Sequence, residues 1–307
     1  MISVAFSSLV RLLLLGSVVI FTFVLVFLPF LSSLPLLTQV LHRLFPFARG
    51  LYEDKVANFW CATSVIFKWH FRVKRERMVQ AALAATIMSF LPSCLRVYRR
   101  PSRLSFLYAL SASSLGFYLF SFQVHEKSIL LPLLPLVLLQ GRHSLLAAWM
   151  GAIATFSCYT LLQKDGHAVG YWVLQVLWTA ASMSWARGEI MRPQAAQSPE
   201  SSGASNSSWV SRVVRKANQH PLLLYRIVQL SLVGVLAVHV AAATLPAIPR
   251  YPDLASMLFV VYAAPHFLLF LGLVVLQQFA LPIEAQEDLE FNAVGDAGQE
   301  QRKSKEQ

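Results

Sequence analysis

Two short runs of charged residues could carry chemistry, because each lies at the edge of a long apolar segment. The first is LFPFARGLYEDKVANFWC, residues 44–61, which holds Arg49, Glu53, Asp54 and Lys55. Adjacent carboxylates beside a lysine and an arginine can hold a cation, orient a sugar hydroxyl, or pair with the neighbouring cations. Spacing alone favours structural ion pairing over a binding site.

The second run is FYLFSFQVHEKSILLPLLP, residues 117–135, in which His125, Glu126 and Lys127 are consecutive between two apolar stretches. A lysine offers a positive charge for a phosphate, and a histidine can donate or accept a proton near neutral pH. Glu126 can act as a base or simply pair with Lys127. The residue types leave a functional site and an ordinary polar turn equally open.

Other polar residues in apolar runs are weaker candidates. Arg226, His239 and His266 are predicted to hydrogen-bond between helices or to extend toward the membrane surface. The pair Lys164–Asp165 is predicted to lie in a solvated loop on the non-cytoplasmic side.

The cysteine count and the motif content argue against several classes of site. The three cysteines, Cys61, Cys94 and Cys158, are far apart, odd in number and surrounded by apolar residues. Such cysteines are predicted to be buried small side chains rather than zinc ligands. The sequence has no glycine-rich phosphate loop and no zinc-protease or serine-hydrolase motif, so no cofactor is expected, and the metal requirement stays open.

The composition identifies the environment in which these residues work. The 307 residues are 56% hydrophobic and 13% charged, whereas soluble domains are roughly 45–50% apolar and about 25% charged. Disordered, collagen-like, disulfide-scaffold and nucleic-acid-binding proteins are excluded by this composition. The chain is therefore a membrane protein.

The apolar runs predict the fold class. They number nine, and several reach the ~20 residues that a helix needs to cross a bilayer: 12–36, 56–70, 78–95, 104–121, 128–140, 144–163, 171–186, 222–243 and 254–279. Only helices and closed barrels can satisfy their backbone in lipid. An all-α protein with about eight or nine membrane segments is expected, in which 128–140, with Pro132 and Pro135, is broken or tilted.

Charge predicts the orientation and the domain boundaries. Residues 1–283 hold 23 basic and 8 acidic residues, and an excess of basic loop residues marks the cytoplasmic side. Residues 1–283 form the predicted transmembrane domain, with a flexible cytoplasmic loop at 187–220. Residues 284–307, with seven acidic residues, form a disordered cytoplasmic tail.

One threading places four basic segments in the cytoplasm: Arg72–Arg77, Arg96–Arg103, Arg142 and 187–220. Glu53–Lys55 and His125–Lys127 then share the opposite side. This threading requires 56–70 to cross the membrane and 78–95, which contains Pro92, to form a hairpin or an interfacial segment. Strict alternation of crossings remains the alternative.

The strings LFPFARGLYEDKVANFWC and LFSFQVHEKSILLPLLP resemble the endoplasmic-reticulum dolichyl-phosphate-glucose-dependent α-1,3-glucosyltransferases. These are multi-spanning enzymes of the GT-C class, glycosyltransferase family 57. The Glu-Asp-Lys-Val-Ala-Asn-Phe-Trp run resembles the first-glucose branch more than the second-glucose branch. The likeness extends from about residue 12 to residue 280.

The resemblance implies an inverting transfer of glucose from dolichyl-phosphate-glucose to the mannose arm of a dolichyl-pyrophosphate-linked oligosaccharide, at the lumenal face of the endoplasmic reticulum. By this resemblance His125 and Lys127 bind the donor phosphate and sugar. Glu126, Glu53 and Asp54 position the substrates, and Arg49 and Lys55 belong to the same substrate-binding set. Inversion requires a carboxylate that removes the proton of the acceptor hydroxyl.

The family's general base is expected to be an aspartate in an early lumenal loop of a longer chain. No acidic residue precedes Glu53 here, so the chain resembles the C-terminal part of such an enzyme, and no catalytic residue is assigned. An inactive fragment and a non-catalytic membrane subunit remain alternatives. The second-glucose enzyme and a transporter are two less favoured alternatives.

Overall fold

The structure is a computed structural model that describes residues 2–44, 55–191, 209–218, 220–246, 249, 251 and 253–281. Every regular element within these residues is a helix, which confirms the all-α prediction. The chain divides into two compact units, Met1–Gly50 and Leu51–Gln307. The predicted tail 284–307 lies outside the described residues.

The first unit is a long apolar helix followed by a short one. Helix α1 (Ile2–Phe27) leads into the 3₁₀ turn η1 (Leu28–Phe30) and then α2 (Leu34–Leu44). Residues Leu9–Phe30 are long and apolar enough to cross a membrane, and none of them is buried. A helix that is apolar on every side belongs in lipid. The predicted span at 12–36 is therefore confirmed, although it ends near Phe30, because Pro29 opens the 3₁₀ turn.

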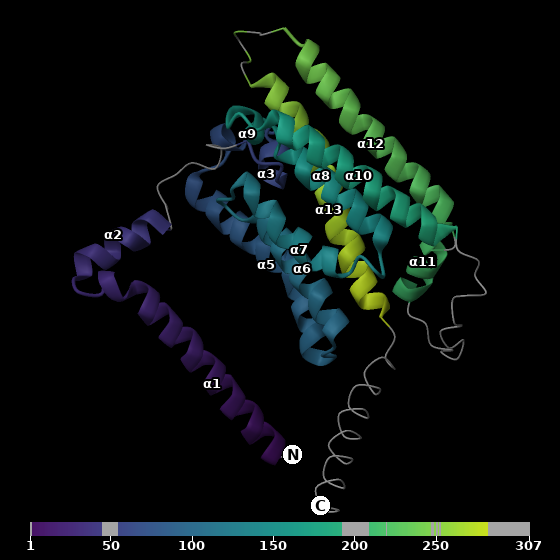
Figure 1. Ribbon diagram of the computed structural model, residues 1–307. Coiled ribbons are helices and arrows are strands. Elements are labelled where there is room, and N and C mark those ends of the chain that lie inside the picture. The colour runs from purple at the N-terminus through teal and green to yellow at the C-terminus, as the bar shows by residue number, and fades with distance from the viewer. Residues whose placement is uncertain are drawn as a thin grey trace, which may run out of the picture. The chain divides into compact units, whose positions relative to one another are not determined.

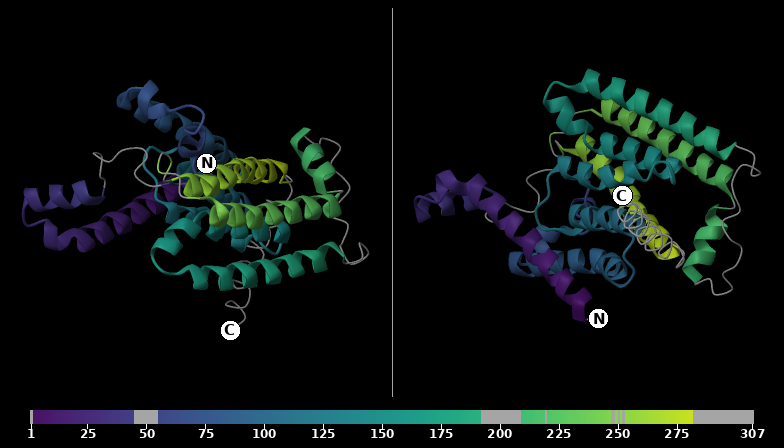
Figure 2. Two further views of the ribbon diagram at one scale, coloured as in Figure 1. Left: turned by 90° about the horizontal axis from the view of Figure 1, so that it is seen from above. Right: turned by 60° about the horizontal axis from the view of Figure 1, so that its bottom comes forward.

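The second unit is a bundle whose helices alternate in direction (Figure 1). Its elements are α3 (Phe59–Thr63), α4 (Trp69–Arg72), α5 (Arg75–Arg99), α6 (Arg103–Phe120), η2 (Glu126–Ile129), α7 (Leu130–Leu138), α8 (Ser144–Ser157), α9 (Tyr159–Lys164), α10 (Ala168–Ile190), α11 (Trp209–Asn218), α12 (Pro221–Thr244) and α13 (Leu254–Ala280). Figure 2 shows α12 lying alongside both α10 and α13. Helix α11 falls inside the predicted loop 187–220.

Contacts between distant residues define one end of this bundle, which we call the His125 end. The indole Nε1 of Trp60 donates to the carbonyl of Phe120 at the end of α6 (2.8 Å). Tyr171, in the first turn of α10, hydrogen-bonds His239 near the end of α12 (3.0 Å). The loops that follow α6, α8 and α12 therefore meet at this end.

The opposite end, which we call the Arg96 end, is held by side chains of α5, α6 and α13. The amide of Gln278 donates to the carbonyls of Ser93 (3.1 Å) and Ser105 (3.0 Å). The guanidinium of Arg96 donates to the carbonyl of Leu281 (3.2 Å). The basic residues 96–103 thus lie at the end of the bundle opposite to His125.

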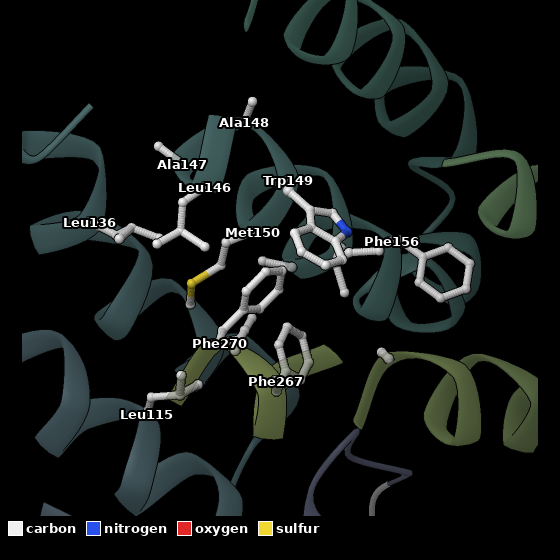
Figure 3. Packing of buried hydrophobic residues seen from close by; sticks show 14 of the residues in the cluster. Leu115, Leu136, Leu146, Ala147, Ala148, Trp149, Met150, Phe156, Phe267 and Phe270 are labelled. Atoms are coloured by element: carbon white, nitrogen blue, oxygen red, sulfur yellow. The ribbon is translucent and has the colours of Figure 1, made fainter. Parts of the chain in front are cut away.

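Helix α8 is the centre of the core. All of its residues except Thr155 are buried, as expected of a helix that is apolar on every side. Its aromatic side chains meet those of α13: the rings of Trp149 and Phe270 lie 4.9 Å apart at nearly a right angle (Figure 3). Alanine and glycine residues on the remaining faces allow its neighbours to approach closely, as is typical of helices packed in membranes.

A chain of hydrogen bonds ties α8 to α12 and α13. The indole of Trp149 donates to the hydroxyl of Ser231 (2.9 Å), which in turn bonds Nε2 of His266 (2.8 Å). Nδ1 of His266 lies 2.8 Å from the carbonyl of Tyr262. His266 and His239 thus bond between helices, as the sequence predicted. Arg226 instead bonds Gln229 in its own helix (3.2 Å).

The prediction that 56–70 crosses the membrane is wrong. This segment forms two helices of five and four residues, α3 and α4. The side chain of Asn58 caps α3 by accepting from the backbone N–H of Cys61 (2.8 Å). The indole of Trp69 donates to Thr63 (2.9 Å), which holds α3 and α4 together. The polar side chains inside this apolar run are used for local capping rather than for a span.

The prediction that 78–95 forms a hairpin is also wrong, while its alternative, an interfacial segment, stays a prediction. Helix α5 runs without a break through Pro92 for 25 residues, and it is long and apolar enough to cross a membrane. A proline removes only one backbone donor, and neighbouring helices compensate for it. Here Gly116 of α6 brings the two helices together, because a Cβ at that position would lie 2.2 Å from the Ser89 hydroxyl.

The corrections at 56–70 and 78–95 leave the candidate site at the predicted end of the bundle, but they move the basic loop between these two segments. Helix α5, rather than 56–70, now connects the two ends of the bundle. Lys55 and His125 therefore remain at the same end, as expected. Residues 72–77, at the start of α5, move to that end as well. The basic residues 96–103, Arg142 and Arg187 lie at the Arg96 end, and the placement of that end in the cytoplasm stays a prediction from the charge pattern.

This topology predicts the labelling of single cysteines in sealed microsomes. In a chain whose exposed Cys94 is replaced by serine, Arg77→Cys and Lys164→Cys should react with a membrane-impermeant maleimide from one side. Arg100→Cys should react from the other side. Labelling of Arg77→Cys together with Arg100→Cys would contradict a membrane-crossing α5.

The close approach of α8 to α10 predicts a large packing effect at one glycine. A Cβ at Gly151 would lie 2.4 Å from the indole nitrogen of Trp178, so Gly151→Ala should destabilise the fold by about 1–3 kcal/mol. The measurement is thermal unfolding of the purified chain in detergent. Gly272→Ala is the matched control, because nothing lies within 4 Å of the added Cβ; equal effects of both variants would contradict this packing.

Candidate functional site

The structure brings the two charged runs together, although they are about 70 residues apart. The hydrogen bond from Trp60 to Phe120 joins the first run to the end of α6. The ring of Phe59 lies 5.6 Å from that of Phe120. Phe122 packs against the small core of Trp60, Met78 and Ala82. The sequence predicted a shared side of the membrane, whereas the structure shows direct contact.

The position of the first run in the described residues depends on its apolar side chains. Val56 and Ala57 are 2% exposed and belong to the main core. Asn58 is also buried, because its side chain caps α3. Asn58 is thus a structural residue, and the peptide around it is anchored against the bundle.

Lys55 is the one predicted site residue of the first run within the described part of the chain. Its ammonium forms an ion pair with the carboxylate of Asp253, directly before α13, and the two side chains are 27% and 58% exposed. Arg49, Glu53 and Asp54 lie outside the described residues. The sequence does not indicate Asp253 as a partner of Lys55, because the two residues are 198 positions apart. An aspartate directly before an apolar helix is also an ordinary capping residue.

The second run forms a tight turn at the His125 end. His125 precedes η2 in an extended conformation, and its carbonyl accepts from the N–H of Ser128 (3.0 Å). Ile129 is fully buried and anchors the turn in the core. The side chains of His125 and Lys127 are consequently exposed, while Glu126 is partly buried.

Cys158, between α8 and α9, supports this turn from behind. Its thiol lies 3.7 Å from the carbonyl of Glu126, so the end of α8 positions the turn. Cys61 and Cys158 are buried, as predicted, but Cys94 is exposed, so that prediction is wrong for Cys94.

A cavity of about 410 Å³ lies beside this turn and along the last two turns of α6. Its lining includes Phe117, Tyr118, Gln123, His125, Ser128 and Leu131. Phe117 and Leu131 are 52% and 66% exposed on the apolar side surface of the bundle. The cavity therefore joins a lipid-facing surface to a polar turn.

The three predicted residues of the turn differ in their relation to the cavity. Only His125 lines it, while Glu126 and Lys127 lie beside it on the same turn. No carboxylate is among its lining residues within the described part of the chain. The described residues also contain no group of three histidine, cysteine or acidic side chains that could hold a metal ion. The geometry suits an amphiphilic ligand with an anionic head group.

Comparison with known proteins identifies the family. The profile of the "ALG6, ALG8 glycosyltransferase family" matches residues 2–273. A "probable dolichyl pyrophosphate Man9GlcNAc2 alpha-1,3-glucosyltransferase" of Dictyostelium discoideum is 37% identical over 265 residues, or 86% of this chain and 50% of that protein. The corresponding protein of Gallus gallus is 36% identical over 269 residues, with 86% and 51% covered.

A relative in Arabidopsis thaliana with the same name as the Dictyostelium protein is 46% identical over 165 residues, or 54% of this chain and 31% of that protein. The chain spans about half the length of the curated relatives that it matches over most of its own length. These matches confirm the resemblance carried by residues 44–61 and 119–135. Because the profile covers nearly all of the described helices, the chain belongs to the ALG6, ALG8 glycosyltransferase family.

Proposed function

We propose that the chain takes part in the transfer of glucose from dolichyl-phosphate-glucose to the mannose arm of a dolichyl-pyrophosphate-linked oligosaccharide, in α-1,3 linkage, in the endoplasmic-reticulum membrane. The observation that carries the proposal is the cavity beside His125, which opens on the apolar surface and ends at a charged turn. A dolichyl chain matches the apolar surface, and a phosphate-linked sugar matches the charged turn. The relatives' names specify the acceptor.

In this proposal, the donor phosphate lies at the turn and the dolichyl chain leaves along α6 and α7. The imidazole of His125 lines the cavity, and the ammonium of Lys127 is exposed on the same turn. Both side chains can donate to phosphate oxygens. Glu126 is partly buried behind them, where it helps to position the lysine.

The reaction forms a bond between the acceptor oxygen and the anomeric carbon of glucose while the bond from that carbon to the phosphate oxygen breaks. The electron pair leaves with dolichyl phosphate, whose negative charge increases by one. Donors placed at that phosphate stabilise the transition state more than the ground state. The acceptor proton passes to a carboxylate, and no described residue that lines the cavity supplies one.

The same observation supports a second candidate function, a non-catalytic chain that binds the lipid-linked donor. Such a chain would use the cavity and the turn in the same way but would not remove the acceptor proton. We keep Glu53, Asp54 and Arg49 as proposed positioning residues for either function. We propose that no organic cofactor is required.

His125→Ala and Lys127→Ala should each lower glucose transfer by roughly 10²- to 10³-fold, as removal of a donor to a developing anion does in other enzymes. The measurement is transfer to the lipid-linked oligosaccharide in membranes of cells that lack the first-glucose step. His167→Ala and Lys68→Ala are matched controls, because both residues are exposed on other loops of the His125 end. They should keep the rate of the parent.

Full activity of His125→Ala would overturn the assignment of the turn to the donor phosphate. A parent chain without transfer, but with dolichyl-phosphate-glucose binding that depends on His125 and Lys127, would establish the second candidate instead. A parent chain that neither transfers glucose nor binds the donor would refute both.

The ion pair between Lys55 and Asp253 predicts that exchanging the two charges restores the activity that a single charge reversal removes. Lys55→Glu should lower transfer by weakening the anchor of the first run, and exchange of both charges, Lys55→Glu with Asp253→Lys, should restore most of it. The pair is partly exposed, so the coupling between the two sites should be about 0.2–1 kcal/mol in a double-mutant cycle of thermal stability. Failure of the exchanged pair to restore transfer would show that Lys55 binds substrate directly.

A further inference from the structure

A second cavity, of about 220 Å³, lies at the same end of the bundle between α9, the end of α12 and the start of α13. Its lining includes Tyr159, Gln163, Lys164, His239, Ser256 and Phe259. The volume is below the ~300 Å³ that marks the lower limit of pockets for drug-sized molecules. The cavity therefore fits a group about as large as a single sugar ring.

Aromatic rings form the inner wall of this cavity. The rings of Tyr159 and Phe259 lie 5.2 Å apart and are nearly parallel. His239 lies between them and Trp172, whose ring is 4.5 Å from the imidazole. Both imidazole nitrogens are occupied, since Nε2 bonds the hydroxyl of Tyr171 and Nδ1 bonds the carbonyl of Val235. Both nitrogens of His239 are thus engaged within the bundle, and its ring lines the cavity.

Polar groups form the outer wall. The side chains of Thr160, Gln163 and Ser256 line the cavity, and none of them hydrogen-bonds another described residue. Gln163 can both donate and accept, as can the two hydroxyls. Lys164 adds one cation, and Asp165 follows it directly in the loop. Neutral donors and acceptors beside aromatic rings in one cavity match the hydroxyl edge and the C–H face of a pyranose.

The second cavity adjoins the donor turn through two consecutive residues. Cys158 contacts the carbonyl of Glu126, and Tyr159, the next residue, lines the second cavity. Residues 158 and 159 thus connect the turn that carries Glu126 to the second cavity. A glycan held in the second cavity would have its neighbouring sugar near the turn that carries His125 and Lys127.

We infer that the second cavity binds one neutral hexose unit of the acceptor glycan and so directs its terminal hydroxyl toward the donor turn. This inference rests on the proposed function, and it adds a place where the acceptor is recognised. The ligand class is a mannose-terminated oligosaccharide, bound through hydroxyl groups to Thr160, Gln163 and Ser256 and through one sugar face to the aromatic wall.

Two variants test this inference in the full chain. Gln163→Ala should raise the acceptor KM roughly 3- to 10-fold, as expected for one lost hydrogen bond, and should leave the KM for dolichyl-phosphate-glucose unchanged. Ala243→Trp, which fills the cavity from the exposed end of α12, should abolish measurable acceptor saturation. Gln229→Ala at the Arg96 end and Ala241→Trp outside the cavity are the matched controls.

A direct binding measurement separates this inference from the proposed function. The probe is the free Man9GlcNAc2 glycan, added to the detergent-purified chain and detected by saturation-transfer NMR. Binding by the parent that is lost in Ala243→Trp and retained in His125→Ala supports the inference even if the chain transfers no glucose. Absence of binding by the parent, or an unchanged acceptor KM and unchanged binding in both cavity variants, would overturn it while leaving the donor assignment intact.

Discussion

The packing of α8 against its neighbours is the constraint on which the rest of the second unit depends. In lipid, apolar side chains gain nothing from leaving water, so helices associate through close contact and hydrogen bonds. Helix α8 provides both: Gly151 admits the indole of Trp178, and Trp149 donates to Ser231. The end of this helix then determines the position of Cys158, and through it the turn at Glu126.

The site at the His125 end combines a lipid-facing surface with polar groups at its edge. The larger cavity opens between Phe117 and Leu131, whereas the smaller one lies among Tyr159, His239 and Phe259. The two cavities therefore differ in chemistry: one suits a lipid-linked anion, and the other suits a neutral polar ring. Cys158, which contacts the carbonyl of Glu126, and Tyr159, which lines the smaller cavity, connect the turn at His125 to that cavity.

Several features of the site could be predicted from single segments. The interhelical roles of His239 and His266 follow from the cost of a polar side chain in an apolar helix, and the structure confirms them. The candidate turn at His125 follows from three ionisable residues between two apolar runs. The long helices could not be predicted in the same way. Pro92 suggests a break in an isolated segment, but α5 continues through it in the packed bundle. The run 56–70 looks like one apolar segment, but Asn58 caps a short helix inside it.

The sequence by itself determined the membrane environment, the helical class and the family, because these depend on composition, on the length of apolar runs and on two long specific strings. Only the tertiary structure decided which runs form long continuous helices, that Trp60 meets Phe120, that Lys55 pairs with Asp253, and that two cavities lie at the His125 end. The physical reason is that these contacts join residues distant in the chain. Their energy depends on how closely helices approach, which no local pattern of residue types contains.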